Sequence, residues 1–218
     1  MSQKERKNVK NHRRIPKQAR ALTKYHQVLD ACSRVLAAQG YAKATMTEIA
    51  LESDLPYATI YQYFENKQDV FIAWFERMSE GLFVQLVRAK ELHQDFSIEG
   101  YVELLIKNTL MFVSVSKGSL NQLFYAMPHL LTSQIIATIE MKAIKLTHVL
   151  FKDQIQKSEL HDADYCVKML TKIVIGYLTQ RILDTESEMD IEKDSKELSL
   201  IINLYLNKKI GAERAGAI

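Results

Sequence analysis

Residues Thr45 to Lys67, with the sequence TMTEIALESDLPYATIYQYFENK, decide the fold of this chain. Thr45 and Glu48 have the spacing of a capping box, in which each side chain accepts the free backbone N–H of the other residue. A helix is therefore expected to begin there. Ser53 and Asp54 prefer turns to helix interiors, so this helix is expected to end after about two turns.

The second helix of the stretch begins after Pro56, whose fixed φ suits a helix start. Ile60 and Phe64 are predicted to point inward. The other side chains are predicted to face outward, and they carry hydroxyls, one amide and one methyl but no charge: Tyr57, Ala58, Thr59, Tyr61, Gln62 and Tyr63. Groups of this kind contact phosphates and base edges in the major groove of DNA. The stretch therefore predicts a helix-turn-helix motif at about residues 44–63.

Phosphate contacts are expected at the edges of the motif. Asn66 is predicted to cap the next helix, with Asp69 at its third position. Lys67 then lies beside the open N–H groups of that helix start, where a phosphate docks. The residues expected to hold phosphates around the motif are Thr45, through its backbone and hydroxyl, Thr47, Tyr63 and Lys67.

The same residues resemble the tetracycline-repressor-like (TetR, or TetR/AcrR) family of bacterial transcriptional regulators. The similarity covers roughly Arg20 to Gly81 and rests on Gly40-Tyr41, Thr45-x-x-x-Ile49-Ala50, Leu55 and Ile60-Tyr61-x-Tyr63-Phe64-x-Asn66-Lys67. Two positions depart from the family pattern. Asp54 stands where Gly is usual in the turn, which asks Asp54 to adopt a left-handed conformation. Ala58 stands where Gly is common, which adds a methyl group facing the DNA.

Composition favours an all-helical protein of ordinary globular type. The chain has 218 residues, 47% of them hydrophobic, with only 7 Gly and 3 Pro. Apolar residues repeat with helical periodicity. No apolar run has the length of a membrane span, and the basic start lacks the apolar core of a secretory signal. We therefore expect a cytoplasmic protein with Cys32 and Cys166 as buried thiols. The family resemblance implies that it is bacterial and nucleoid-associated when bound to DNA.

Positive charge is concentrated at the N-terminus. Residues 1–24 hold nine Lys or Arg and a single acid, although the net charge of the whole chain is only +3. A basic arm ahead of a helix-turn-helix attracts phosphates and can enter the adjacent minor groove. The residues expected to do so are Arg13, Arg14, Lys17 and Arg20. The alternative is a solvated tail that aids solubility.

The periodicity predicts about nine helices in four regions. Residues 1–20 form the arm, 21–81 the three-helix DNA-binding domain, 82–208 a ligand-binding and dimerisation domain, and 209–218 a flexible tail. The helix of residues 67–87 links the two domains, and Trp74 on it is expected to be core. Further helices are predicted at 97–116, stopped by Ser116-Lys117-Gly118, and at 119–127, 130–156, 163–184 and 190–207.

The last two predicted helices, residues 163–184 and 190–207, have more apolar surface than one domain can cover. Met169 to Leu183 is apolar nearly all round, and Gly176 within it permits close approach of a second backbone. A helix of this kind needs cover on every side. We expect a homodimer with a four-helix interface, as the family resemblance also implies. A two-fold dimer matches a roughly palindromic operator in double-stranded DNA. The alternative is a core helix of a monomer.

Aromatic, Met and His residues of the middle region are candidates to line an effector cavity: Phe112, Phe124, Tyr125, Met127, His129, Met141, His148, Tyr165, Met169 and Tyr177. Met and Tyr fill irregular apolar space and supply orienting hydroxyls. The family resemblance implies a small-molecule inducer at such a site. Because no Lys or Arg cluster lies on an inward face, a neutral or apolar effector is expected. For any single residue, plain core packing is the competing interpretation.

The sequence offers no pattern for a metal, a cofactor or catalysis. The six His lack close-spaced pairs and Cys companions, and no phosphate loop or nucleophile elbow is present. We therefore predict a regulator, most simply a repressor released by a small molecule, and not an enzyme. The alternative is a helical small-molecule sensor whose basic arm meets anionic membrane. The arm is not amphipathic enough to favour that alternative, so no membrane partner is predicted.

Overall fold

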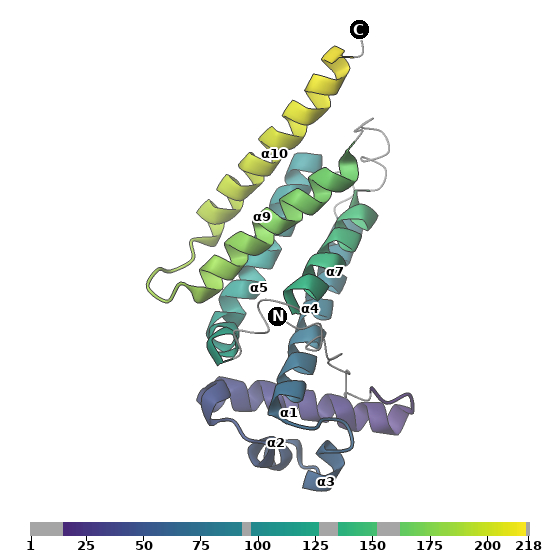
Figure 1. The fold of residues 1–218 in the computed structure, drawn as a ribbon, viewed down its shortest axis with the longest axis vertical. Coiled ribbons are helices and arrows are strands. Elements are labelled where there is room, and N and C mark those ends of the chain that lie inside the picture. The colour runs from purple at the N-terminus through teal and green to yellow at the C-terminus, as the bar shows by residue number, and fades with distance from the viewer. Residues whose placement is uncertain (1–14, 93–96, 127–134, 152–161, 217–218) are drawn as a thin grey trace, which may run out of the picture. The chain divides into compact units, whose positions relative to one another are not determined.

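The computed structural model describes residues 15–92, 97–126, 135–151 and 162–216, and these residues form eight α-helices and no strand. The helices are α1 (Ala19–Lys43), α2 (Met46–Ser53), α3 (Tyr57–Ile60), α4 (Lys67–Leu92), α5 (Ile98–Ala126), α7 (Ile135–Leu150), α9 (Ala163–Leu183) and α10 (Ile191–Gly216) (Figure 1). The predicted all-helical fold is confirmed. The chain divides into two compact units, residues 1–77 and 78–218, and α4 runs from the first into the second.

The first unit is built on α1. Its inward face carries Tyr25, Val28, Leu29, Cys32, Val35 and Leu36, all buried. Gly40 interrupts the helix with φ 76° and ψ 170°. This positive φ is strained for any residue with a Cβ, so glycine permits the change of direction before α2. The predicted helix end at Gly40 is therefore confirmed as a break, after which one further turn reaches Lys43.

The two ends of α2 have the predicted geometry. The Thr45 hydroxyl accepts the Glu48 N–H at 3.2 Å, and the Glu48 carboxylate accepts the Thr45 N–H at 2.8 Å. At the other end, Asp54 adopts the left-handed conformation, with φ 53° and ψ 36°. The Asp54 N–H donates to the carbonyl oxygens of Ala50 and Leu51. Aspartate therefore takes the left-handed position after the helix that glycine usually occupies.

The start of α4 completes the core of the first unit. Asn66 Oδ1 accepts the Asp69 N–H at 3.0 Å, which is the predicted cap. Val70, Phe71 and Trp74 are buried, so Trp74 belongs to the core as predicted. Arg77 forms an ion pair of 2.8 Å with Asp30 of α1.

The second unit has α5 at its centre, in contact with α9 and α10, while α7 contacts α9 (Figure 1). Val102, Ile106 and Leu110 of α5 pack with Leu198 and Ile202 of α10 in one hydrophobic cluster. Among the described residues, no helix combines the length and hydropathy that crossing a membrane requires.

Helix boundaries in the second unit correct two predictions. The expected stop at Ser116-Lys117-Gly118 is wrong, because α5 continues to Ala126. Leu120 and Phe124 beyond it are buried, and burial of two large side chains outweighs the roughly 1 kcal/mol helix cost of one glycine. The last helix runs on to Gly216, past the tail expected from residue 209. Of the helix predicted at residues 130–156, the described part is α7.

The contribution of the capping box to stability can be tested by mutation. Thr45→Ala removes the acceptor for the Glu48 N–H and is expected to lower the free energy of unfolding by about 1 kcal/mol. Thr47→Ala, two residues later at an exposed position, is the matched control and is expected to change the free energy of unfolding by less than about 0.5 kcal/mol. Denaturant unfolding of the full chain measures both, and equal effects would contradict a cap at Thr45.

Candidate nucleic-acid interface

The four residues of α3 are held in place by buried side chains at the end of the helix and directly after it. Ile60 and Phe64 are fully buried, and the Phe64 ring stacks on Tyr25 of α1 with centroids 5.0 Å apart. Tyr63 is also buried, with 9% of its surface exposed, and its ring meets Tyr25 edge-on at 6.0 Å. The prediction that Tyr63 faces outward is therefore wrong. Its ring fills the space between the motif and α1.

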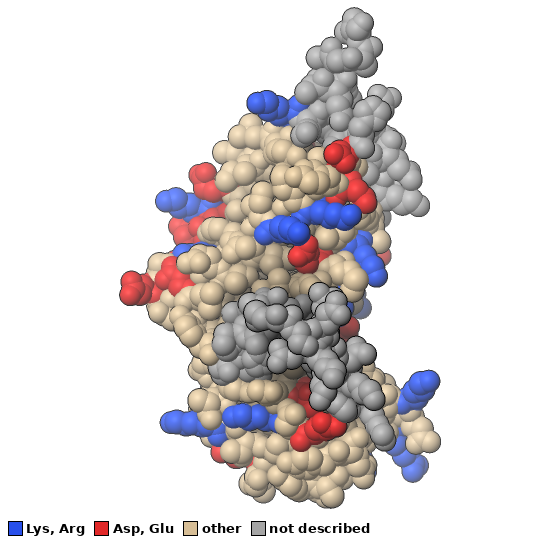
Figure 2. All heavy atoms as spheres, in the orientation of Figure 1, with Lys and Arg blue, Asp and Glu red and all other residues tan. Residues whose placement is uncertain are grey.

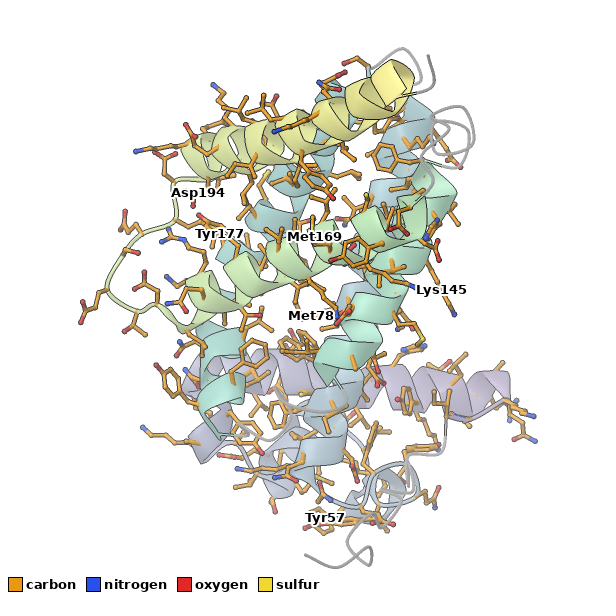
Figure 3. All side chains as sticks on the ribbon, turned by 45° about the horizontal axis from the view of Figure 1, so that its top comes forward. Tyr57, Met78, Lys145, Met169, Tyr177 and Asp194 are labelled. Carbon is orange, nitrogen blue, oxygen red and sulfur yellow. The ribbon has the colours of Figure 1, made fainter. Side chains whose placement is uncertain are left out.

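The outward face of residues 57–62 is uncharged, as predicted. Tyr57 and Tyr61 are 47% and 43% exposed, Ala58 and Gln62 are exposed, and Thr59 is half-buried. Figure 3 shows Tyr57 at the outer edge of the ribbon. In the space-filling view, the surface around α3 is mostly free of charged side chains (Figure 2). Such a surface can approach base edges without desolvating a charge.

Tyr57 and Tyr61 form a pair on this face. Their hydroxyl oxygens are 2.9 Å apart and their ring centroids 4.8 Å apart. The hydrogen bond to Tyr57 raises the pKa of Tyr61 above its usual value. One of the two hydroxyl groups donates its proton to the other. The pair therefore has one O–H donor left for a ligand.

Thr45 is placed beside the motif, but its polar groups already have partners. Its hydroxyl and its N–H both lie 2.8 Å from Glu48 Oε2. Hydrogen bonds from Gln39 and Thr45 lower the pKa of the Glu48 carboxyl, so this group is ionised at neutral pH. The expected phosphate contact through the backbone N–H and hydroxyl of Thr45 is therefore not available in this geometry. Thr47, in the same turn, is exposed.

Lys67 does not take the position predicted for it. Its ammonium donates to the carbonyl oxygens of Tyr41 at 3.2 Å and Ala44 at 3.0 Å. It also lies 4.5 Å from the centroid of the Tyr41 ring, in a cation–π contact. The side chain is turned toward the end of α1, and not toward the N–H groups at the start of α4 as predicted.

The described cations of the arm are exposed. Lys17 and Arg20 lie at the surface before and within the first turn of α1, while Arg13 and Arg14 fall outside the described residues. Sequence reasoning passed over Lys24 and Lys43, which are also exposed on α1. A signal for Lys43 existed in the sequence, since it stands two residues before the start of the motif at Thr45.

The effector candidates of the second unit are not gathered in one interior. Phe124 is buried, whereas Phe112, His148, Met169 and Tyr177 are half-buried. Tyr125, Met141 and Tyr165 are more than half exposed, so they do not line an enclosed space within a single chain. Met127 and His129 lie outside the described residues.

Two of the half-buried candidates already have polar partners. His148 Nε2 lies 3.1 Å from Asp164 Oδ1, which joins α7 to α9. Tyr177 is bonded to Asp194, and burial together with this bond raises the pKa of Tyr177 to about 12. Figure 3 shows Tyr177 on α9 and Asp194 on α10. In the part of the chain that the structure describes, no group of three or more His, Cys, Asp or Glu residues could hold a metal ion.

Both α9 and α10 carry large apolar side chains that are exposed. Those of α9 are Tyr165 and Ile173, and those of α10 are Leu200, Ile201 and Leu204. Gly176 is exposed as well, and a Cβ placed there would meet nothing within 4 Å. Exposed apolar side chains of this size make α9 and α10 candidates for a protein–protein interface.

Comparison with known proteins places the motif in a family. Residues 28–74 match the family model described as "Bacterial regulatory proteins, tetR family". The fatty acid metabolism regulator protein of Bacillus subtilis (strain 168) is 37% identical over 62 residues, which are 28% of this chain and 31% of that protein. The match therefore spans about a third of the curated relative.

Solved structures share the fold over most of the chain. The fatty acid degradation regulator FadR from Bacillus halodurans has a TM-score of 0.62 and 19% identity, over 82% of this chain and 94% of that chain. FadR from Bacillus subtilis, solved in complex with stearoyl-CoA, has a TM-score of 0.56 and 20% identity, over 82% of this chain and 97% of that chain. At this identity the similarity shows the fold.

Gln62 is expected to read bases, because it is exposed, uncharged and able to donate and accept at one base edge. Gln62→Ala should change the base preferred at one position of each half-site, with a loss of about 1–3 kcal/mol on the original sequence. Selection of bound duplexes by the parent and the variant measures this. Glu65→Ala, also exposed nearby, is the control, and an unchanged preference in both variants would remove Gln62 from the reading surface.

Proposed function

We propose that this chain, a transcriptional regulator of the TetR family, is a repressor that binds a palindromic operator as a homodimer and leaves it when a small molecule binds. The observation that carries the proposal is the exposed, uncharged face of Tyr57, Ala58, Tyr61 and Gln62, fixed from behind by buried Ile60 and Phe64. Base contact needs side chains that are free on one side and immobile on the other.

The dimer is supported by the apolar side chains of α9 and α10. Leu200, Ile201 and Leu204 lie within two turns of α10 and remain exposed in the single chain. Their burial against a second copy would remove apolar surface from water on both subunits. A two-fold axis through this region gives each dimer two motifs, which is the reason to expect a palindrome.

The effector is proposed to carry an apolar chain. The interior of the second unit is apolar, with Leu170, Val174 and Leu178 of α9 packed against the cluster of α5 and α10. The solved structure of the Bacillus subtilis FadR holds stearoyl-CoA, so a long-chain acyl-CoA is the first compound to test. Its binding would favour one of two conformations that differ in the separation of the two motifs, with α4 as the connecting element.

Selection from a random duplex pool tests the DNA-binding function. The full-length protein is expected to enrich a sequence with two inverted half-sites, about one helical turn or a multiple apart. Stearoyl-CoA added to the complex is expected to release the DNA, while coenzyme A without an acyl chain is not. Enrichment of no sequence would refute the proposal, and release by neither compound would refute the acyl effector alone.

The dimer is tested by a charge placed in the apolar surface. Leu204→Glu buries a carboxylate in the proposed interface, so the protein is expected to sediment as a monomer and to bind the enriched duplex at least about 10-fold more weakly. Leu51→Glu, at an exposed leucine of the other unit, is the control for oligomeric state. A Leu204→Glu protein that still sediments as a dimer would exclude this interface.

A further inference from the structure

The junction between α1 and α2 contains two lysines whose ammonium groups have different surroundings. Lys67 reaches this junction from the first turn of α4, and Lys43 belongs to the junction itself. An ammonium has three N–H donors. Two donors of Lys67 are used by the carbonyl oxygens of Tyr41 and Ala44, and the group lies over the Tyr41 ring.

These contacts fix the segment from Tyr41 to Ala44. Tyr41 and Ala44 are both buried, and the Tyr41 ring packs against Phe71 of α4 at 4.7 Å. The carbonyl oxygens at the end of α1 carry the negative end of the helix dipole, which a cation stabilises. Lys67 therefore ties the start of α4 to the end of α1, directly before the cap of α2.

Lys43 lies within the segment that Lys67 holds, and its side chain is exposed. It has no ion pair or hydrogen bond with any residue that the structure describes. Other basic groups of the unit are occupied in part. Arg34 donates to the Glu52 carbonyl at 3.0 Å and pairs with its carboxylate, and Arg77 pairs with Asp30. A phosphate can approach Lys43 without breaking an existing contact.

We infer that Lys43 supplies the cationic DNA-backbone contact beside the first helix of the motif, and that Lys67 is a positioning residue that holds the Lys43 segment and binds no phosphate. The inference rests on the proposed DNA-binding function. It deepens that function, because it assigns the phosphate contact to Lys43 and not to Lys67, which the sequence had suggested.

The salt dependence of DNA binding tests the inference, since each lysine–phosphate contact adds about 0.9 to the slope of log K against log salt concentration. With the duplex enriched from the random pool, Lys43→Gln is expected to lower the slope by about 0.9 for each bound copy of the chain. Its thermal midpoint should equal that of the parent. Lys43→Arg should restore the slope.

Lys67→Met is expected to lower the thermal midpoint. At a temperature where this variant is folded, its salt slope should equal that of the parent. Lys196→Gln on α10, an exposed lysine of the other unit, removes the same charge and controls for net charge. A parental slope in Lys43→Gln overturns the inference while the proposed function stands, and so does a reduced slope in Lys67→Met with an unchanged midpoint. Failure of the parent to bind any duplex overturns both.

Discussion

Burial of Ile60, Tyr63 and Phe64 against α1 is the constraint on which the rest of the first unit depends. A helix of four residues has no stability of its own, because the cost of nucleation exceeds the gain from its few hydrogen bonds. Burial of the three side chains supplies the missing stability, at about 1.5–3 kcal/mol for each large apolar group removed from water. Burial of these three side chains determines which residues between Tyr57 and Gln62 face outward.

The polar groups at the edges of the motif are used mainly inside the protein. Glu48 holds both donors of Thr45, and the carbonyl oxygens at the end of α1 hold the Lys67 ammonium. These bonds make the turn between α1 and α2 rigid, which a reading surface requires. They also remove those donors from the set available to phosphates. Free cations must come from elsewhere, and Lys17, Arg20 and Lys43 are exposed.

In the second unit, too, several polar side chains are used in contacts between helices. Tyr177, Arg181 and Asp194 link α9 to α10, with Arg181 Nε 3.5 Å from Asp194 Oδ2. Lys117 and Asn121 of α5 bond the carbonyl oxygens of Ser187 and Ile182 near the end of α9. The orientation of the two helices is thus set by polar contacts at one end, and several of their apolar side chains remain exposed.

The sequence by itself determined that the elements are helices and, in the first unit, their order. Local spacing is enough for a capping box, a glycine break and a helical stripe, because those features depend on residues within one or two turns of each other. Thr45 with Glu48, Gly40 and the left-handed Asp54 were predictable for that reason. The TetR-type motif was recognisable because it is a compact local pattern.

Only the tertiary structure decided which polar and aromatic side chains are free. Tyr63 is turned inward by Tyr25, 38 residues away in the chain, and Lys67 by carbonyl groups 23 and 26 residues away. The continuation of α5 through Gly118 likewise depends on the burial of Leu120 and Phe124. Contacts between distant segments outweigh a local preference of about 1 kcal/mol, and periodicity contains no information about them.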